Sequence, residues 1–240
     1  MKEVLYTIPV NDIFSTVCEC PICEMRRRLE KDAVEFTMGP SYMEDDIRLT
    51  TDKIGFCERH MQQLYDFENR LGLALIINTH MQHIIKEIEV KQKKGRKAAG
   101  GLFGKRELTP VGEYTKSLEH SCYICDRIHN TFDRYVATTF YLYERDEAFR
   151  TKFKKCRGFC VEHYGLLYET APKYLSGNTL TEFTKQLDTI FLENFKRMQE
   201  EVSWFIDKFD YRNADAPWKT SKDSVPRAMT KLNKIIPPEK

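Results

Sequence analysis

The chain carries the same set of cysteines and histidine twice, and this duplication constrains its fold more than any other feature. Each copy reads C-x2-C and then G-F-C-x2-H, after a gap of 33 residues (24–56) in the first copy and 34 residues (126–159) in the second. Three thiolates and one imidazole form a donor set that suits a tetrahedral zinc ion. The spacing predicts two structural zinc ions, one per repeat. The predicted ligands are Cys20, Cys23, Cys57 and His60 in the first copy, and Cys122, Cys125, Cys160 and His163 in the second.

The spacing inside each pair also indicates what kind of site to expect. Donors three residues apart lie on one side of a single helical turn. Pro21 and Gly55 indicate that the pairs lie at helix starts, where the helix dipole favours thiolates. Two such turns that face each other fill all four positions of a tetrahedron and leave none open for water, as in a structural site. We therefore predict that each ion is held within one copy, so that Cys20 and Cys57, for example, share an ion.

The repetition extends beyond the ligands. Thr7-Ile8-Pro9-Val10 precedes the first C-x2-C, and Thr109-Pro110-Val111 precedes the second. A Leu-Tyr pair follows each histidine at the same distance, as Leu64-Tyr65 and as Leu167-Tyr168. A period near one hundred residues is too long for a stacked array of repeats. The pattern therefore predicts two homologous domains.

Apolar residues recur at helical spacing through most of both repeats, which predicts an all-α fold. The segment 128–143 is rich in aromatic and β-branched residues, so its pattern does not distinguish a helix from a strand. Only residues 6–10 read as extended. The expected helices cover 23–36, ended by Gly39-Pro40, about 56–88, with Gly72 as a point where the helix can bend, and 180–209.

Two segments lie outside the repeats. Residues 91–108 are rich in lysine and glycine, which is typical of a mobile linker. Residues 213–240 are rich in proline and mildly basic. We therefore expect four parts: a first helical repeat over 1–90, a flexible basic linker over 91–108, a second helical repeat over 109–212 and an extended basic tail over 213–240.

Composition narrows the class of protein. The chain has 240 residues, of which 41% are hydrophobic and 31% charged, as in soluble globular proteins. Its formal charge of +2 does not suggest a polyanionic partner for the whole molecule. No apolar run approaches the roughly 20 residues of a membrane-spanning helix, and the N-terminus lacks the apolar region of a signal peptide. We therefore predict a cytoplasmic protein without membrane contact, where C-x2-C pairs more often bind metal or act in redox chemistry than form structural disulfides.

Other uses of the cysteines are less consistent with the pattern. Unliganded cysteines would simply be small buried hydrophobes, but two matched copies argue against that reading. An iron–sulfur cluster normally takes four cysteines. Covalent haem needs a histidine directly after C-x2-C, where this chain has Glu24 and Asp126. The H-x-E motif of zinc-dependent deaminases does not occur in the sequence.

A redox function is the main alternative. Cys122-x2-Cys125-x3-His129 resembles the C-x2-C-x3-H centre of the helical disulfide reductases that act with peroxidases. The resemblance implies that an exposed thiolate attacks while the histidine moves a proton. The first repeat has Arg27 at the corresponding place, so only the second copy fits.

Several residues outside the two ligand sets are weaker candidates for a functional role. His80, His83 and Glu87 can share one helix face, as a metal or acid/base site or as an ordinary polar face, and the polar face is favoured. Cys18 and Cys156 lie near the ligand pairs and read as packing residues. The basic linker can contact phosphates, although charge runs of this kind are more often simply solvated.

Residues 6–12, 20–24, 39–46 and 55–57 together resemble an uncharacterised bacterial domain-of-unknown-function family, found mostly in Gram-positive anaerobes. The likeness runs from the N-terminus to about residue 211, and it implies no activity because none is established for that family. The sequence as a whole predicts a zinc-stabilised binding or scaffold protein with a protein partner, and with nucleic acid as a less supported one. The alternative is a thiol-based redox enzyme or a redox or metal sensor that uses the C-x2-C pairs; whether the chain is an enzyme is left open, with a non-enzymatic role favoured.

Overall fold

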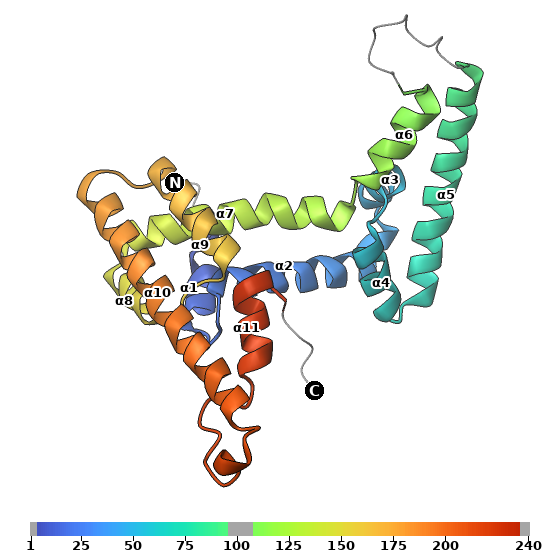
Figure 1. Ribbon diagram of the computed structural model, residues 1–240. Helices are drawn as coiled ribbons and strands as arrows, with labels where there is room; N and C mark the ends of the chain where they lie inside the picture. The colour runs from blue at the N-terminus through green and yellow to red at the C-terminus, as the bar shows by residue number, and fades with distance from the viewer. Residues whose placement is uncertain (1–3, 96–107, 236–240) are drawn as a thin grey trace, which may run out of the picture. The chain divides into compact units, whose positions relative to one another are not determined.

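The computed structural model describes residues 4–95 and 108–235 (Figure 1). Every regular element in these ranges is a helix, so the all-α prediction is confirmed. The chain forms two compact units. One, here called the split unit, consists of Met1–Arg28 and Thr131–Lys240, and the other, the inserted unit, consists of Leu29–Asn130.

The split unit contains most of the second half of the chain together with the N-terminal segment. Its helices are α1 (Thr7–Ser15), the start of α2 (Pro21–Met38), the later part of α7 (Tyr123–Arg145), α8 (Glu147–Lys155), α9 (Val161–Thr170), α10 (Gly177–Asp207) and α11 (Ser224–Asn233). Short 3-10 turns accompany them at Val4–Tyr6, Ala171–Lys173 and Tyr211–Asn213.

The inserted unit is built from the remaining helices. It contains the later part of α2, a 3-10 turn at Pro40–Met43, α3 (Asp45–Ile54), α4 (Glu58–Asp66), α5 (Arg70–Lys93), α6 (Pro110–Glu119) and the start of α7. In this unit α5 packs against both α3 and α6 (Figure 1).

These units cross the boundaries that the repeats suggest. Each repeat, 1–90 and 109–212, contributes residues to both units, because α2 and α7 each run from one unit into the other. The split unit combines α1 and the start of α2 with α8, α9 and α10, whereas the inserted unit combines α6 and the start of α7 with α3, α4 and α5. Each unit therefore combines the opening helices of one repeat with the closing helices of the other repeat. Sequence similarity identifies which segments match, but it does not report which segments pack together.

Most helices lie where periodicity placed them. The expected helix over 23–36 is α2, the ladder over 180–209 is α10, and the ambiguous segment 128–143 is helical within α7. The single helix expected over 56–88 is instead two, α4 and α5. Asn69 separates them, because its side chain accepts a hydrogen bond from Gly72 N at 2.9 Å and so caps the start of α5.

Two other expectations are wrong. Residues 6–10 are not extended: Tyr6 ends a 3-10 turn and residues 7–10 begin α1, whose Val10, Ile13 and Phe14 are buried. The tail over 213–240 is not extended throughout, because residues 224–233 form α11. Of the predicted linker, residues 91–93 belong to α5, and residues 96–107 lie outside the described part of the chain.

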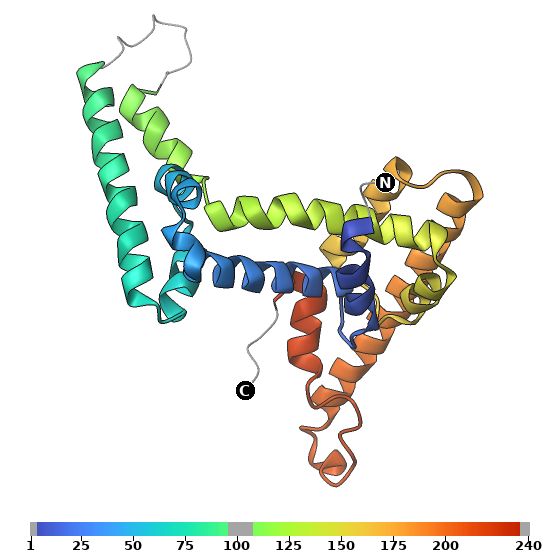
Figure 2. The same ribbon diagram turned by 180° about the vertical axis from the view of Figure 1, so that it is seen from behind.

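Aromatic side chains form much of the core of the split unit. The ring of Phe153 lies 5.2–5.7 Å from the rings of four neighbours, measured between centroids. Such contacts add to the stabilisation that burial of the rings provides. Phe14 links α1 to this core, and α1 packs against α8 (Figure 2). The four neighbours of Phe153 are Phe14, Tyr143, Phe159 and Phe183.

None of the described helices combines the length and the apolar character that crossing a bilayer requires.

Candidate metal centres

The eight predicted ligands gather in two clusters, but not in the combinations that their spacing predicted. In each cluster the ligand atoms of all four residues lie within 4.8 Å of one another. The prediction that each set forms within one copy of the motif is wrong, because the C-x2-C of each copy meets the C-x2-H of the other. The buried cluster comprises Cys20, Cys23, Cys160 and His163, and the half-exposed cluster comprises Cys57, His60, Cys122 and Cys125.

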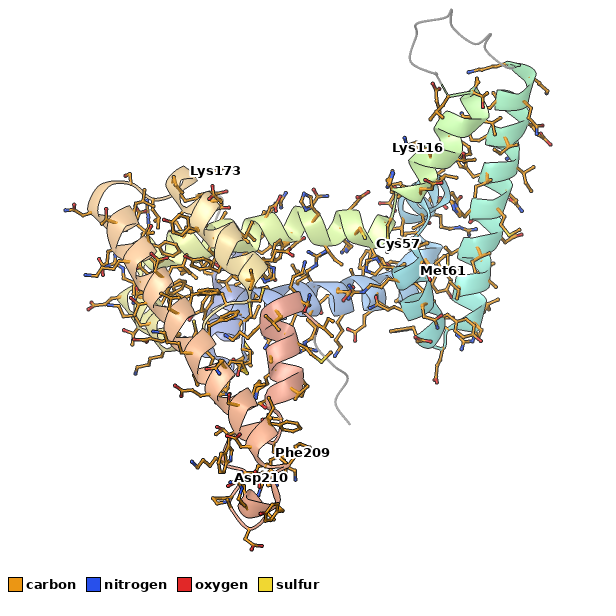
Figure 3. The ribbon with its side chains drawn as sticks, viewed as in Figure 1. Cys57, Met61, Lys116, Lys173, Phe209 and Asp210 are labelled. Carbon is orange, nitrogen blue, oxygen red and sulfur yellow. The ribbon has the colours of Figure 1, made fainter. Side chains whose placement is uncertain are left out.

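This exchange follows from the two units. The first C-x2-C opens α2 inside the split unit, where α9 supplies the C-x2-H. The second C-x2-C opens α7 inside the inserted unit, where α4 supplies the C-x2-H; Figure 3 shows Cys57 at the start of α4. Each cluster therefore forms where two helix starts meet, as the sequence predicted, although the helices come from different repeats.

In the buried cluster the Nδ1 atom of His163 faces three sulfur atoms. It lies 3.5 Å from Cys20 Sγ, 3.3 Å from Cys23 Sγ and 3.2 Å from Cys160 Sγ. The sulfurs of Cys23 and Cys160 are 3.7 Å apart. A tetrahedral zinc ion with bonds of about 2.3 Å to sulfur and about 2.0 Å to nitrogen separates its donors by roughly 3.5–3.8 Å. The donors therefore fit one such ion, and no residue of the four is more than 4% exposed.

The half-exposed cluster has the same internal arrangement. His60 Nδ1 lies 3.3 Å from Cys57 Sγ, 3.2 Å from Cys122 Sγ and 3.4 Å from Cys125 Sγ. The sulfurs of Cys57 and Cys125 are 4.0 Å apart. His60 and Cys122 are buried, whereas Cys57 is half-buried and Cys125 is exposed. The donor set again suits a tetrahedral ion, with one side of the cluster open to solvent.

A carboxylate fixes the orientation of His60. Its Nε2 donates to Glu30 Oε1 at 3.0 Å, and Arg59 pairs with the other carboxylate oxygen at 2.7 Å. A proton on Nε2 leaves the lone pair of Nδ1 directed at the sulfurs, which is the usual support for a metal-bound histidine. Burial raises the pKa of Glu30, but the hydrogen bond from His60 and the charge of Arg59 outweigh it and lower this pKa. The sequence analysis did not identify Glu30, because it lies 30 positions from His60 and contacts it only in the folded structure.

Were no ion bound, the charges in the half-exposed cluster would favour one thiolate beside a protonated imidazole. Burial raises the pKa of Cys122, but its hydrogen bond with His60 outweighs this and lowers the pKa to about 6. Burial lowers the pKa of His60, yet Cys122 and Glu30 raise it to about 9. Burial and the neighbouring Cys122 raise the pKa of Cys125 to about 12. A bound cation would replace the imidazole and thiol protons, so metal binding here must release protons.

The buried cluster has a comparable charge pattern. Hydrogen bonds from Cys20, Cys23 and then His163 hold the pKa of Cys160 far below its ordinary value, despite burial. Burial and the contact with Cys160 raise the pKa of Cys20 to about 12. One sulfur therefore carries negative charge that its neighbours stabilise.

The glycine of each G-F-C-x2-H motif is required by its backbone. Gly55 has φ of +66° and Gly158 has φ of +81°, a region that side-chain-bearing residues rarely adopt. A Cβ at Gly55 would lie 2.5 Å from His80 Nε2, and one at Gly158 would lie 3.1 Å from Asn194 Cβ. His80 is itself placed by a 2.7 Å hydrogen bond to the carbonyl of Asp52. This packing role fits the interpretation of the His80 face as structural.

In the inserted unit, backbone contacts join the two loops that carry the ligands. Tyr123 N donates to Gly55 O at 3.0 Å, and Ser121 Oγ donates to Ile54 O at 2.6 Å. These bonds connect the start of α7 to the end of α3 and the loop that precedes α4. They hold the two ligand pairs at a fixed separation.

The split unit joins its equivalent loops differently. Pro21 stands where the second copy has Tyr123, and proline has no N–H to donate. Instead Lys231 of α11, only 1% exposed, donates from Nζ to Glu19 O at 2.7 Å and to Arg157 O. A side chain near the C-terminus thus connects the loop before α2 to the loop before α9. No sequence motif indicated this role for Lys231.

Lys231 belongs to a buried network of charges beside the buried cluster. The carboxylate of Glu19, whose side chain is 5% exposed, accepts contacts from four cations at 2.6–3.6 Å. Burial lowers the pKa of Lys231, and Glu19 counters that effect. Buried charges of this kind are tolerated only when they are paired. The four cations are Arg157, Arg197, Arg227 and Lys231.

Comparison with known protein families assigns the chain to one of them. A model described as "Family of unknown function (DUF6062)" matches residues 1–239. The chain belongs to this family. No curated protein matches it, and no solved structure does.

The remaining cysteines and His129 lie outside both clusters. Burial raises the pKa of Cys18 to about 11 and that of Cys156 to about 12, so both stay protonated thiols at neutral pH. His129 is exposed on α7, and the imidazole that contacts Cys122 is His60 at 3.2 Å. The partner of the C-x2-C pair is therefore a histidine from the other repeat, which the motif alone did not indicate.

Proposed function

We propose that this chain is a cytoplasmic, zinc-stabilised binding or scaffold protein in which each cluster holds one structural zinc ion. The observation that carries the proposal is the meeting of two complete Cys3His sets from four helix starts. Zinc accepts sulfur and nitrogen donors in a tetrahedron without a preference from d-electrons. Four protein donors leave no position for a reacting water, which supports a structural role for both ions.

The position of the ligands along the chain supports the same conclusion. The contacts of the buried cluster join residues 137–143 positions apart, and those of the half-exposed cluster join residues 62–68 positions apart. Because such a site does not exist in the unfolded chain, metal binding contributes directly to folding. For zinc-finger peptides that contribution is about 10–16 kcal/mol in apparent terms, as large as the whole net stability of a typical domain.

We also infer that the two repeats are homologous. Helices α1 to α5 and α6 to α10 follow one another in the same order, with a ligand pair at the start of the second and fourth helix of each set. A duplication of one helical unit accounts for both the matched motifs and the reciprocal exchange of ligand pairs.

A protein partner is supported by the end of α10. Ile206, Phe209 and Tyr211 are 63%, 75% and 86% exposed there, and Figure 3 shows Phe209 at this end. The loop that follows is ordered by Lys208, whose Nζ donates to the carbonyls of three residues at 2.6–2.8 Å. Exposed apolar side chains on an ordered support are typical of an interaction surface. Nucleic acid is the less supported partner.

The test is elemental analysis of the purified full chain, followed by replacement of the metal with Co²⁺. We expect two ions per chain and the intense visible bands of tetrahedral cobalt with sulfur ligands. Removal of the metal by a chelator should abolish cooperative unfolding, followed by circular dichroism. A folded, monodisperse preparation that binds no metal would refute the proposal.

The second candidate is a thiol-based redox enzyme or sensor. Exposure of Cys125 is the observation that favours it, because an accessible sulfur can react. Reversible cycling between dithiol and disulfide by Cys122 and Cys125, without metal, would support this candidate over a structural site.

A further inference from the structure

The two clusters offer the same donors but differ in the accessibility of their sulfurs. In the buried cluster every cysteine is at most 4% exposed. In the half-exposed cluster Cys125 is exposed and Cys57 is half-buried, while Cys122 is 3% exposed. A small oxidant in solution can therefore reach a sulfur of one cluster and not of the other.

The two accessible sulfurs are also neighbours. Cys57 Sγ and Cys125 Sγ lie 4.0 Å apart, and they belong to different helix starts, Cys57 at the N-cap of α4 and Cys125 in the first turn of α7. A disulfide bond needs a sulfur–sulfur distance of about 2.05 Å. Side-chain rotation of two partly exposed residues can close a gap of this size.

We propose that the half-exposed cluster is a redox-sensitive metal site, in which a hydroperoxide converts Cys57 and Cys125 to a disulfide and the cluster gives up its ion. The buried cluster keeps its own ion under the same conditions. This inference rests on the proposed metal binding and adds its regulation. The site responds to peroxide and does not catalyse turnover.

The reaction balances in two steps. Cys125, which is a thiolate when it holds a metal ion, attacks one peroxide oxygen, which gives a sulfenic acid and releases hydroxide, or an alkoxide if the peroxide is organic. The Cys57 thiolate then attacks the sulfur of that sulfenic acid and displaces its oxygen as a second hydroxide. Two sulfurs have lost two electrons, the peroxide has gained them, and two protons from solvent neutralise the anions released.

The disulfide removes two of the four metal ligands, and this loss explains why the half-exposed cluster releases its ion. After the disulfide forms, only Cys122 and His60 can still hold the ion, and two donors are too few for a closed tetrahedral site. The disulfide would still join α4 to α7, so the inserted unit keeps a covalent link where it loses the metal. The buried cluster has no accessible sulfur at which the first step can begin.

The experiment uses the full chain loaded with two zinc ions and treated with a small excess of hydrogen peroxide. A zinc-sensitive dye should report release of one of the two ions, and peptide mapping should find Cys57 linked to Cys125. A dithiol reductant followed by zinc should restore two ions per chain. Release of both ions or of neither, or a disulfide between other cysteines, would overturn the inference. A chain that never binds zinc would instead refute the proposed function.

Two variants sharpen the test. Cys125→His keeps four metal donors but removes the first sulfur, so this variant should hold two zinc ions and release zinc to peroxide at least about tenfold more slowly. Cys156→Ser removes a thiol outside both clusters and should behave like the native chain. Equal release from native protein and Cys125→His would show that Cys125 is not the reacting sulfur. If Cys125→His holds a single ion, peroxide should release none of it.

Discussion

The two Cys3His clusters share a donor set and a local geometry, yet they are supported in different ways. The buried cluster lies beside the charge network of Glu19. Its two loops are connected by Lys231 of α11, a helix that follows both repeats. In the half-exposed cluster, hydrogen bonds from a backbone N–H and a serine hydroxyl connect the loops that carry the ligands, and Glu30 orients the histidine. The same motif thus occurs in a buried cluster and in an accessible one, and different side chains outside the motif support each cluster.

The largest expected effect tests which ligands share an ion. Cys20→Ser with Cys160→Ser damages one cluster, so this variant should retain one metal ion per chain. Cys20→Ser with Cys57→Ser damages both clusters and should retain none. Because each site is worth about 10–16 kcal/mol in peptide systems, each damaged unit should lose its cooperative unfolding. Metal stoichiometry and circular dichroism measure both outcomes. One ion retained by Cys20→Ser/Cys57→Ser would restore the pairing within each repeat.

The next effect concerns a cut between the repeats. After cleavage at a specific protease site introduced within 96–107, the two fragments should elute together, since each cluster draws two ligands from each side of the cut. Chelation should separate them, because each fragment alone has only incomplete clusters. The cleaved Cys20→Ser/Cys57→Ser chain is the matched control and should separate without chelator. Fragments that part while both ions stay bound would contradict the exchanged pairing.

A third prediction separates the supports of the two clusters. Lys231→Met removes the cation that joins the loops of the buried cluster and leaves Glu19 with one partner fewer. Breaking a buried ion pair in this way costs about 3–5 kcal/mol. Metal exchange at the buried cluster should therefore accelerate, measured with a chromophoric chelator, while the half-exposed cluster is unchanged.

Lys234→Met is the control for that experiment. Lys234 lies just after α11 and pairs with Glu162 at the surface, where both side chains are partly exposed. Surface pairs contribute about 0–1 kcal/mol. An equal effect of the two substitutions would mean that charge near α11, and not the bridge by Lys231, protects the cluster.

The smallest effect concerns the orientation of His60. Glu30→Gln keeps the shape of the side chain but removes its charge, and changes to such supporting groups typically lower metal affinity by about 10–100-fold. Competition with a chelator should show that weakening at the half-exposed cluster alone. Glu35→Gln, on the same helix and exposed, is the matched control. Weakening of both sites by Glu30→Gln would indicate a general loss of stability.

Local patterns predicted a large part of this molecule. The period of apolar residues located α2 and α10, and the spacing of donors correctly placed each ligand pair at a helix start. Two local predictions from the sequence were wrong. Residues 6–10 read as extended, but most of them begin α1, a helix that buries Val10, Ile13 and Phe14. The single helix expected over 56–88 is divided because Asn69 caps a new start.

The sequence by itself determined the chemistry of the two sites, because donor type and a three-residue spacing are properties of one helical turn. Only the tertiary structure decided which turns meet, which centre is open to solvent, and that Lys231 and Glu30 support them. The physical reason is distance along the chain, because Cys23 and Cys160 are 137 positions apart and meet only when the start of α2 packs beside the start of α9 in the split unit. No periodicity within one segment encodes that contact.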